Sequence, residues 1–247
     1  MIRSSRSHFL LFIIIVGGII FSNARAEEKV YVVVLFNRNY VVGASSMRSG
    51  LFYSEDNGDS WLHTGWSNVR AFGAAIDMSD TKRMFLAAGN GIHRTTDGGK
   101  FWKITTNWHI TEAMRVAIDP VSDSTIYTAT AYGIFKSTDN GNSWVEKNNG
   151  LRSTYTSSLL ADKKVPHRLL TGTEEAPYIS DDGGEHWRRY ASDSTINKAV
   201  LDIEQSRSEP DVLMLTTEKD GIWRSTDDGN YWAKTANGLP DAPWYSV

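Results

Sequence analysis

Five short stretches decide the fold: SEDNGDSW at 54–61, TTDGGKFW at 95–102, STDNGNSW at 137–144, SDDGGEHW at 180–187 and STDDGNYW at 225–232. They share the pattern Ser/Thr-x-Asp-x-Gly-x-x-Trp, and their aspartates lie 41, 42, 43 and 45 residues apart. Self-similarity at this period is typical of propellers and solenoids. The chain is therefore a tandem repeat.

Each repeat contains four short β-rich runs separated by turn signals, and in the third repeat these runs are 115–120, 125–130, 133–137 and 143–147. The shared motif joins the third run to the fourth as a hairpin. Its Asp carboxylate can accept backbone N–H groups of the turn, and its Gly can supply a positive φ. One four-stranded antiparallel sheet cannot bury both of its faces, so the copies are expected to pack around an axis.

The sequence thus predicts an all-β protein, a β-propeller of four-stranded antiparallel blades. Five blades are visible, together with the start of a sixth, because residues 236–240 repeat the inter-blade pattern of 148–151 and residues 244–247 fall where a further first strand would begin. A ring that is incomplete at its C-terminal end is the favoured interpretation, and an atypical ring closed by the last strand is the alternative.

The motif and its spacing resemble the Asp-box (BNR) repeat family, which includes sialidases, sortilin-type receptors, xyloglucanase-type glycosidases and photosystem II assembly factors. The resemblance covers residues 30–237. In that family the box lies at the blade periphery, which implies that the box residues are structural; here they are Asp56, Asp97, Asp139, Asp182 and Asp227, with Trp61, Trp102, Trp144, Trp187 and Trp232. Function is left open, because the family contains enzymes, receptors and assembly factors.

The N-terminus has the pattern of an export signal. Arg3 and Arg6 precede an apolar run over 9–21, and Ala24 and Ala26 are small residues at the positions that a signal peptidase reads. We expect a signal peptide over 1–26 and a propeller domain over 27–247. The apolar run is shorter than the roughly 20 residues that a membrane-spanning helix needs. The mature protein is therefore expected to be periplasmic or extracellular, with no integral membrane segment.

Charge and cysteine content narrow the choice of partners. Cleavage after Ala26 leaves 23 basic residues against 29 acidic ones, a net charge of −6. Nucleic acids and anionic membranes favour basic surfaces, so neither is an expected partner. The chain has no cysteine, so packing alone must stabilise it. The histidines are dispersed and residues 139–142 lack calcium-loop spacing, so no metal and no cofactor are expected.

The loops between blades are the candidate ligand face. With the motif hairpins at one end of the propeller, the connections between blades and the turns between second and third strands share the other end, where members of the resembling family bind ligands. The candidates are Trp66, Arg70, Trp108, His109, Tyr132, Arg152 and Tyr155. Aromatic and Arg side chains contribute strongly to interfaces, although loops are also polar for purely structural reasons. We expect non-catalytic binding of a protein or glycan.

The alternative is a secreted glycoside hydrolase of the sialidase type. Such an enzyme needs two carboxyl groups about 5 to 10 Å apart, and Glu112 and Glu174 are the candidates. Solvated loop acids would account for the same two residues, and the Arg-Ile-Pro sequence that sialidases carry is absent. The discriminating feature is an acid pair and an arginine cluster that converge in the central cleft.

Overall fold

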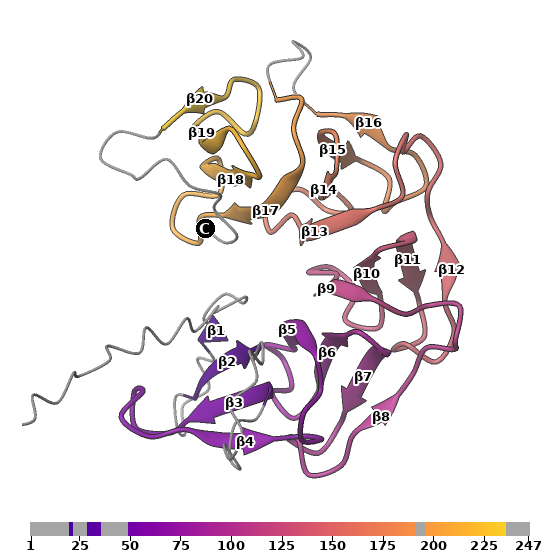
Figure 1. Cartoon of the computed structure of the whole chain (residues 1–247), viewed down its shortest axis with the longest axis vertical. Helices are drawn as coiled ribbons and strands as arrows, with labels where there is room; N and C mark the ends of the chain where they lie inside the picture. Colours follow the sequence, from indigo (N-terminus) through magenta and orange to yellow (C-terminus); the bar gives the residue numbers. More distant parts are fainter. Residues whose placement is uncertain (1–19, 22–28, 36–48, 191–195, 236–247) are drawn as a thin grey trace, which may run out of the picture.

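The computed structural model describes residues 20–21, 29–35, 49–190 and 196–235, and over these it is all-β. Five four-stranded antiparallel sheets follow one another around a common axis, and each is called a blade here (Figure 1). Blade 1 contains β1 (Ile20–Phe21), β2 (Val30–Val34), β3 (Gly50–Ser54) and β4 (Leu62–Thr64). Blade 2 contains β5 (Ala71–Ile76), β6 (Met84–Ala88), β7 (Gly91–Thr95) and β8 (Lys103–Ile104).

The other three blades repeat this order. Blade 3 contains β9 (Ala113–Ile118), β10 (Ile126–Thr130), β11 (Gly133–Ser137) and β12 (Val145–Glu146). Blade 4 contains β13 (Thr156–Ala161), β14 (Leu169–Thr173), β15 (Pro177–Ser180) and β16 (Arg188–Arg189). Blade 5 contains β17 (Val200–Gln205), β18 (Leu213–Thr217), β19 (Gly221–Ser225) and β20 (Ala233–Lys234). The predicted β-propeller of four-stranded antiparallel blades is confirmed.

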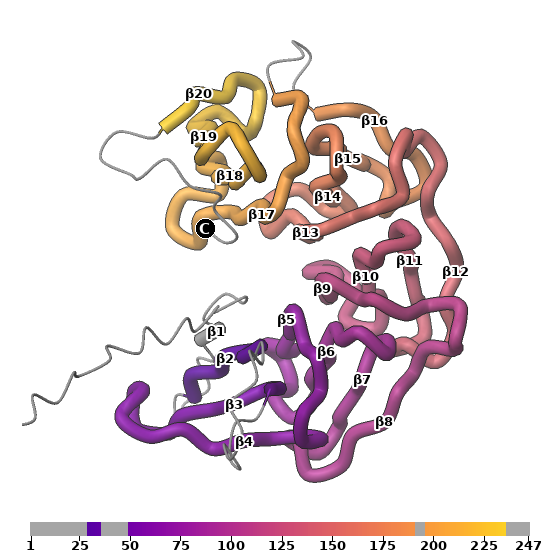
Figure 2. Tube along the Cα trace, viewed as in Figure 1, coloured from indigo at the N-terminus to yellow at the C-terminus, as the bar shows by residue number. Residues whose placement is uncertain are grey.

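In blades 2 to 5 the first strand lies toward the axis and the fourth lies at the periphery (Figure 2). The inner strands β5, β9, β13 and β17 contact one another in sequence around the axis. Each of them has a register shift near its start, as between Ala71 and Gly73 in β5. The outermost strands are only two or three residues long, which limits the edge that each blade exposes to further strand pairing.

The hydrophobic core is divided among the blade interfaces. Phe85 and Ile92 of blade 2 pack with Val116 and Ile126 of blade 3, and equivalent clusters join blades 1 and 2, 3 and 4, and 4 and 5. Side chains alternate between the two faces of a strand, so one face of each blade packs on the preceding blade and the other on the following blade. A blade is therefore stabilised chiefly by its neighbours.

The repeated motif forms the hairpin between the third and fourth strands through local hydrogen bonds. In blade 3, Ser137 Oγ donates to Asp139 Oδ1 over 2.8 Å, and Gly141 N donates to Ser137 Oγ over 2.7 Å. Ser143 N also donates to Asp139 Oδ1 over 2.8 Å. Hydrogen bonds from the Ser143 and Ser137 hydroxyls and the Ser143 amide lower the pKa of Asp139 to about 2. The other four motifs repeat the Ser/Thr–Asp–Gly pattern.

Two consecutive residues in each motif have positive φ, one more than the sequence pattern indicated. In blade 3 they are Asn140, with φ of 61°, and Gly141, with φ of 80°. The first of the two is Asn, Gly or Asp in every blade, which are the residue types that best tolerate this region. Two positive φ values in succession fit the right-handed twist of the flanking strands, as in type I′ hairpin turns.

The motif tryptophans contribute to the blade interfaces. Trp102, Trp187 and Trp232 are almost completely buried, and Trp102 and Trp144 also cover their own hairpins by donating from Nε1 to the carbonyls of Gly99 and Gly141. Trp61 is 42 % exposed. It belongs to blade 1, which has no preceding blade among the described residues.

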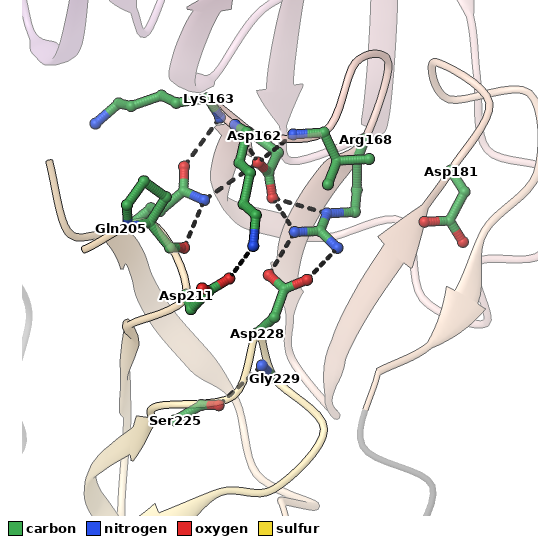
Figure 3. Close-up of polar contacts among 12 residues, drawn as sticks. Asp162, Lys163, Arg168, Asp181, Gln205, Asp211, Ser225, Asp228 and Gly229 are labelled. Atoms are coloured by element: carbon green, nitrogen blue, oxygen red, sulfur yellow. Dashed lines mark hydrogen bonds and ion pairs between the residues drawn. The ribbon is translucent and has the colours of Figure 1, made fainter. Parts of the chain in front are cut away.

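Two arginines, the buried Arg168 and the half-buried Arg83, join neighbouring blades on the side of the motif hairpins. Arg168 donates from Nε to Asp162 Oδ2 of its own blade over 2.7 Å and from Nη1 to Asp228 Oδ2 of blade 5 over 2.7 Å (Figure 3). Arg83 is its equivalent in blade 2, and it donates to Asp77 and to the Oδ1 atom of Asn140 in blade 3. In both cases the acceptor in the next blade is the residue that follows the motif Asp.

The ends of the chain lie mostly outside the described residues. This holds for the predicted signal peptide over 1–26, except for β1, and for residues 236–247, where the start of a sixth blade is expected. Strand β1 falls within the predicted signal peptide and pairs with β2, with Ile20 opposite Tyr31 and Phe21 opposite Val30. In the part of the chain that the structure describes, no helix is long and apolar enough to cross a membrane.

Candidate functional site

The connections between blades meet the turns between second and third strands at the end of the propeller opposite the motif hairpins; we call this surface the loop face. Backbone hydrogen bonds link these segments. Gly89 N donates to the carbonyl of Arg70 over 2.9 Å, and Glu112 N donates to the carbonyl of Gly89 over 2.9 Å. Ala131 N then donates to the carbonyl of Glu112 over 3.2 Å. The loops of blades 2 and 3 thus form one connected surface.

Four aromatic side chains from the candidate set are exposed on the loop face. Their exposed fractions are 46 % for Trp66, 78 % for Trp108, 54 % for Tyr132 and 43 % for Tyr155. Trp66 and Trp108 lie in the connections before blades 2 and 3, Tyr155 lies in the connection before blade 4, and Tyr132 lies in the β10–β11 turn. Exposed rings can stack on a ligand with little loss of side-chain entropy.

Two of these rings are held by neighbouring histidines. The Trp66 ring centroid lies 4.9 Å from that of His93, at an interplanar angle of 60°. His93 is buried, its Nε2 lies 2.8 Å from Asn90 Oδ1, and burial lowers its pKa to about 4. It is therefore neutral at physiological pH and acts as a fixed support for Trp66. The Trp108 and His109 ring centroids lie 3.3 Å apart at an interplanar angle of 33°, so these two adjacent side chains form one aromatic surface.

The charged candidates are distributed over the same face. Arg70 Nη1 lies 3.5 Å from Glu112 Oε2, and the Arg70 guanidinium lies over the Phe72 ring, 5.0 Å from its centroid. Arg152 is exposed in the β12–β13 connection, one residue before Ser153, whose Oγ donates to Glu174 Oε1 over 2.8 Å. Glu112 is thus paired with Arg70, and Glu174 is bonded to Ser153. Glu112 lies in the connection before blade 3, whereas Glu174 lies in the β14–β15 turn of blade 4.

The axis of the propeller contains a cavity of about 110 Å³ that all five blades line. Arg115 of β9 reaches across it, with Nη2 3.2 Å from Asp202 Oδ1 of β17, while Arg115 Nη1 donates to the carbonyls of Phe72 and Met114. Asp202 is buried and pairs with Arg115, whereas Glu204 is exposed. The confined surroundings of the Glu204 carboxyl, and next the negative charge of Asp202, raise the pKa of Glu204 to about 7.

Asp202 and Glu204 are not among the site residues predicted from the sequence. The sequence did contain a pattern that distinguishes them. At the matching positions the inner strands β5, β9 and β13 carry Gly, Ala, Ser, Leu or Arg, and among these four strands only β17 carries two acids on alternate residues. A second missed feature is an Asp that directly follows the inner strand in blades 2 to 4, namely Asp77, Asp119 and Asp162, each of which is buried and accepts backbone N–H groups of the next turn. Its constant offset from the motif could have revealed this structural role.

No group of three or more His, Cys, Asp or Glu side chains suited to a metal ion occurs within residues 20–21, 29–35, 49–190 and 196–235. The site is thus described by exposed aromatic rings, paired charges and a small axial cavity.

Comparisons with known proteins agree with this architecture. A family model for Sortilin-Vps10, described as "Sortilin, neurotensin receptor 3", matches residues 132–246, which is less than half of the chain. A search of curated proteins by sequence returns no match.

Several solved structures share the fold. An ancestral GH74 enzyme superposes with a TM-score of 0.66 at 21 % identity, covering 89 % of this chain and 31 % of its own. The extracellular domain of a protein described as a one-component system of B. thetaiotaomicron gives 0.63 at 14 % identity, covering 87 % of this chain and 27 % of its own. YCF48 from Cyanidioschyzon merolae gives 0.56 at 15 % identity, covering 87 % of this chain and 68 % of its own.

The chain thus spans about a third of the GH74 structures that it matches. Identities this low carry the fold and not the activity. The five repeated motifs resemble Asp-box (BNR) repeats, and the five antiparallel blades and the solved structures together show that the chain has the β-propeller fold.

Proposed function

We propose that the protein is an exported, non-catalytic β-propeller that binds a protein or glycan ligand through its loop face. The observation that carries the proposal is the set of four exposed aromatic rings on one connected surface, which are Trp66, Trp108, Tyr132 and Tyr155. Large exposed rings near buried supports are typical of binding anchors. Arg70 and Arg152 add hydrogen-bond donors at the same end of the propeller.

Export is part of the proposal. It is supported by the Arg3 and Arg6 residues, the apolar run over 9–21 and the Ala24 and Ala26 positions. Structural neighbours include an extracellular domain, which is a compatible location for the fold.

The glycosidase alternative has one observation in its favour. Asp202, Glu204 and Arg115 line the axial cavity, and a carboxyl with a pKa near 7 is suited to general acid catalysis. Two facts count against it. Small-molecule sites usually measure about 300 to 1,000 Å³, so a cavity of about 110 Å³ is small for a sugar ring. Asp202 is also already engaged in an ion pair with Arg115.

The test compares two sets of exposed aromatic residues. One variant carries Trp66→Ala and Trp108→Ala on the loop face, and the matched control carries Phe101→Ala and Tyr231→Ala, whose rings are 69 % and 71 % exposed at the motif hairpins. Binding is measured on a glycan array and on a panel of purified envelope proteins from the same cell. We expect the loop-face variant to lose at least about tenfold in affinity while its melting temperature stays unchanged, because each anchor contributes roughly 1 kcal/mol or more.

Two results would remove the proposal: equal binding by wild type and the loop-face variant, or loss of binding in the control alone. If the wild type hydrolyses an aryl glycoside and Glu204→Gln abolishes that hydrolysis, the protein is a glycoside hydrolase instead.

A further inference from the structure

A cavity of about 320 Å³ lies between blades 1 and 2 on the side of the motif hairpins. Gly98 and Lys100 are exposed beside it, whereas Tyr31 and Thr64 are buried, so the cavity extends from the surface into the interface. Among the described residues that line it there is no Asp or Glu, but there are two lysines and two tyrosines, namely Lys29, Lys100, Tyr31 and Tyr53.

The equivalent place between blades 3 and 4 contains a cluster of ion pairs. Lys147 Nζ of blade 3 lies 2.6 Å from Glu185 Oε2 in the motif hairpin of blade 4. Lys136 Nζ, also of blade 3, lies 3.8 Å from Glu185 Oε1. The hydrogen bond from Lys147 lowers the pKa of Glu185, so its carboxyl group is ionised. A hairpin carboxylate between two lysines thus fills this place.

Blade 1 has neutral side chains where blade 3 has these two lysines. Tyr53 has the position of Lys136, because each directly precedes the motif Ser and lies opposite the first residue of its outer strand. Thr64 has the position of Lys147, because each is two residues beyond that first residue. The ion-pair cluster of blades 3 and 4 therefore cannot form between blades 1 and 2.

The motif hairpin of blade 2 contributes a cation and an open glycine to the cavity. Lys100 has the position of Glu185, three residues after the motif Asp. Gly98 directly follows the motif Asp, where Asn140 and Asp228 each bond to an arginine of the preceding blade. A Cβ at Gly98 would lie 4.0 Å from its nearest atom beyond the adjacent residues, so this side of the cavity is open.

The side chains around the cavity are chiefly donors. Lys29 Nζ lies 2.6 Å from Glu55 Oε1 and 4.9 Å from the centroid of the Tyr53 ring. Glu55 is 44 % exposed, and an ion pair at such a surface position is weak, so Lys29 can also bind a second anion. Burial raises the pKa of Tyr31, so its hydroxyl stays protonated and can donate. With Lys100 on the blade 2 side, the cavity is suited to an anion.

We propose that this cavity binds a small molecule through a carboxylate group, which takes the place that the Glu185 carboxylate has between blades 3 and 4. The Lys29 and Lys100 ammonium groups supply the positive charge, and the Tyr31 and Tyr53 hydroxyls donate hydrogen bonds to the carboxylate oxygens. The volume of about 320 Å³ is at the lower end of the range of roughly 300 to 1,000 Å³ that small-molecule sites have. The site lies on the side of the motif hairpins, so it is independent of ligand binding at the loop face.

The experiment is calorimetric titration of the full chain with succinate at low ionic strength, with succinamide as the uncharged probe of similar shape. We expect one saturable site for succinate and none for succinamide. Added salt should weaken the binding, because it screens the lysine charges. In an amide NMR spectrum, succinate should shift the signals of residues 98–100.

Two variants of one residue and a matched control locate the site. Lys100→Glu gives the blade 2 hairpin the acid that Glu185 supplies in blade 4, and it should weaken succinate binding by at least about tenfold. Lys100→Gln removes only the charge and provides the same test if Lys100→Glu does not fold. Lys103→Glu makes the same change of charge in the same blade, but Lys103 lies opposite Arg94, whose side chain contacts blade 3. It should leave the affinity unchanged.

The proposal is supported if the wild type and Lys103→Glu bind succinate and the folded Lys100 variants do not. It is overturned if the wild type does not bind succinate, if the Lys100 variants keep the wild-type affinity, or if Lys103→Glu loses as much affinity as they do. Binding of inorganic phosphate without binding of succinate would also overturn it. The loop-face variant with Trp66→Ala and Trp108→Ala should bind succinate as the wild type does, which separates this test from that of the loop face.

Discussion

Replacing Arg168 by Ala should destabilise the propeller more than any other single change of a charged residue that we consider. The Arg168 side chain is 9 % exposed and Asp162 is fully buried, while Asp228 is 25 % exposed (Figure 3). Removing one partner from a buried ion pair typically costs about 3 to 5 kcal/mol, because a buried charge is left uncompensated. Asp162 keeps hydrogen bonds from the amides of Lys164 and Val165, which places the expected loss near the lower end, at about 3 kcal/mol.

Thermal and urea unfolding provide the assay. For a domain of this size, a loss of about 3 kcal/mol corresponds to a fall in melting temperature of about 6 to 12 °C. The equivalent Arg83→Ala in blade 2 is the matched comparison and should cost less, because Arg83 bonds to the neutral Asn140 where Arg168 bonds to Asp228. The double variant Asp162→Ala/Arg168→Ala should lose less free energy of unfolding than the two single variants lose together. A loss below about 1 kcal/mol, or strictly additive losses, would contradict this prediction, because it would mean that the pair behaves like a surface salt bridge.

Three further predictions follow from single features. Gly141→Val should lower the free energy of unfolding by roughly 1 to 3 kcal/mol, because a β-branched residue is forced to a φ of 80°. Asp139→Ala should also lower the melting temperature. Loss of ligand binding with an unchanged melting temperature would show instead that the motif is a binding site. The raised pKa of Glu204 means that its neutral form stabilises the folded state fully below about pH 4.5, and that this stabilisation is lost as the pH rises through about 7. Glu204→Gln stays neutral at every pH, so it should stabilise the protein most above pH 7. Parallel plots of stability against pH for the variant and the wild type would contradict this. N-terminal sequencing of exported protein should begin at Glu27, and a chain that retains Met1 in the cytoplasm would contradict export.

The strand content and blade architecture could be predicted from the sequence because their causes are local. Each motif supplies the hairpin with a hydroxyl, a carboxylate and a glycine within eight residues, so Asp139 and its four counterparts fix the period and the turn. The second positive φ, at Asn140, was missed because asparagine adopts this conformation without requiring it as glycine does.

The contacts between blades could not be predicted in the same way. Arg168 and Asp228 are 60 residues apart in the chain, and the axial pair of Arg115 and Asp202 is 87 residues apart. Single-sequence patterns indicate which residues form a strand, but they do not show which side chains meet across a blade interface. The same limit applies to Glu204, whose raised pKa depends on the enclosure around the axis.

Hydrogen-exchange footprinting of the ligand complex shows which end of the propeller binds the ligand. With a ligand taken from the array or protein panel, we expect slowed amide exchange in the inter-blade connections over 65–70, 105–112 and 150–155, and in the turn at 131–132, with unchanged exchange in the motif hairpins. Protection confined to the hairpins around Asp97, Asp139 and Asp182, with none on the loop face, would contradict it.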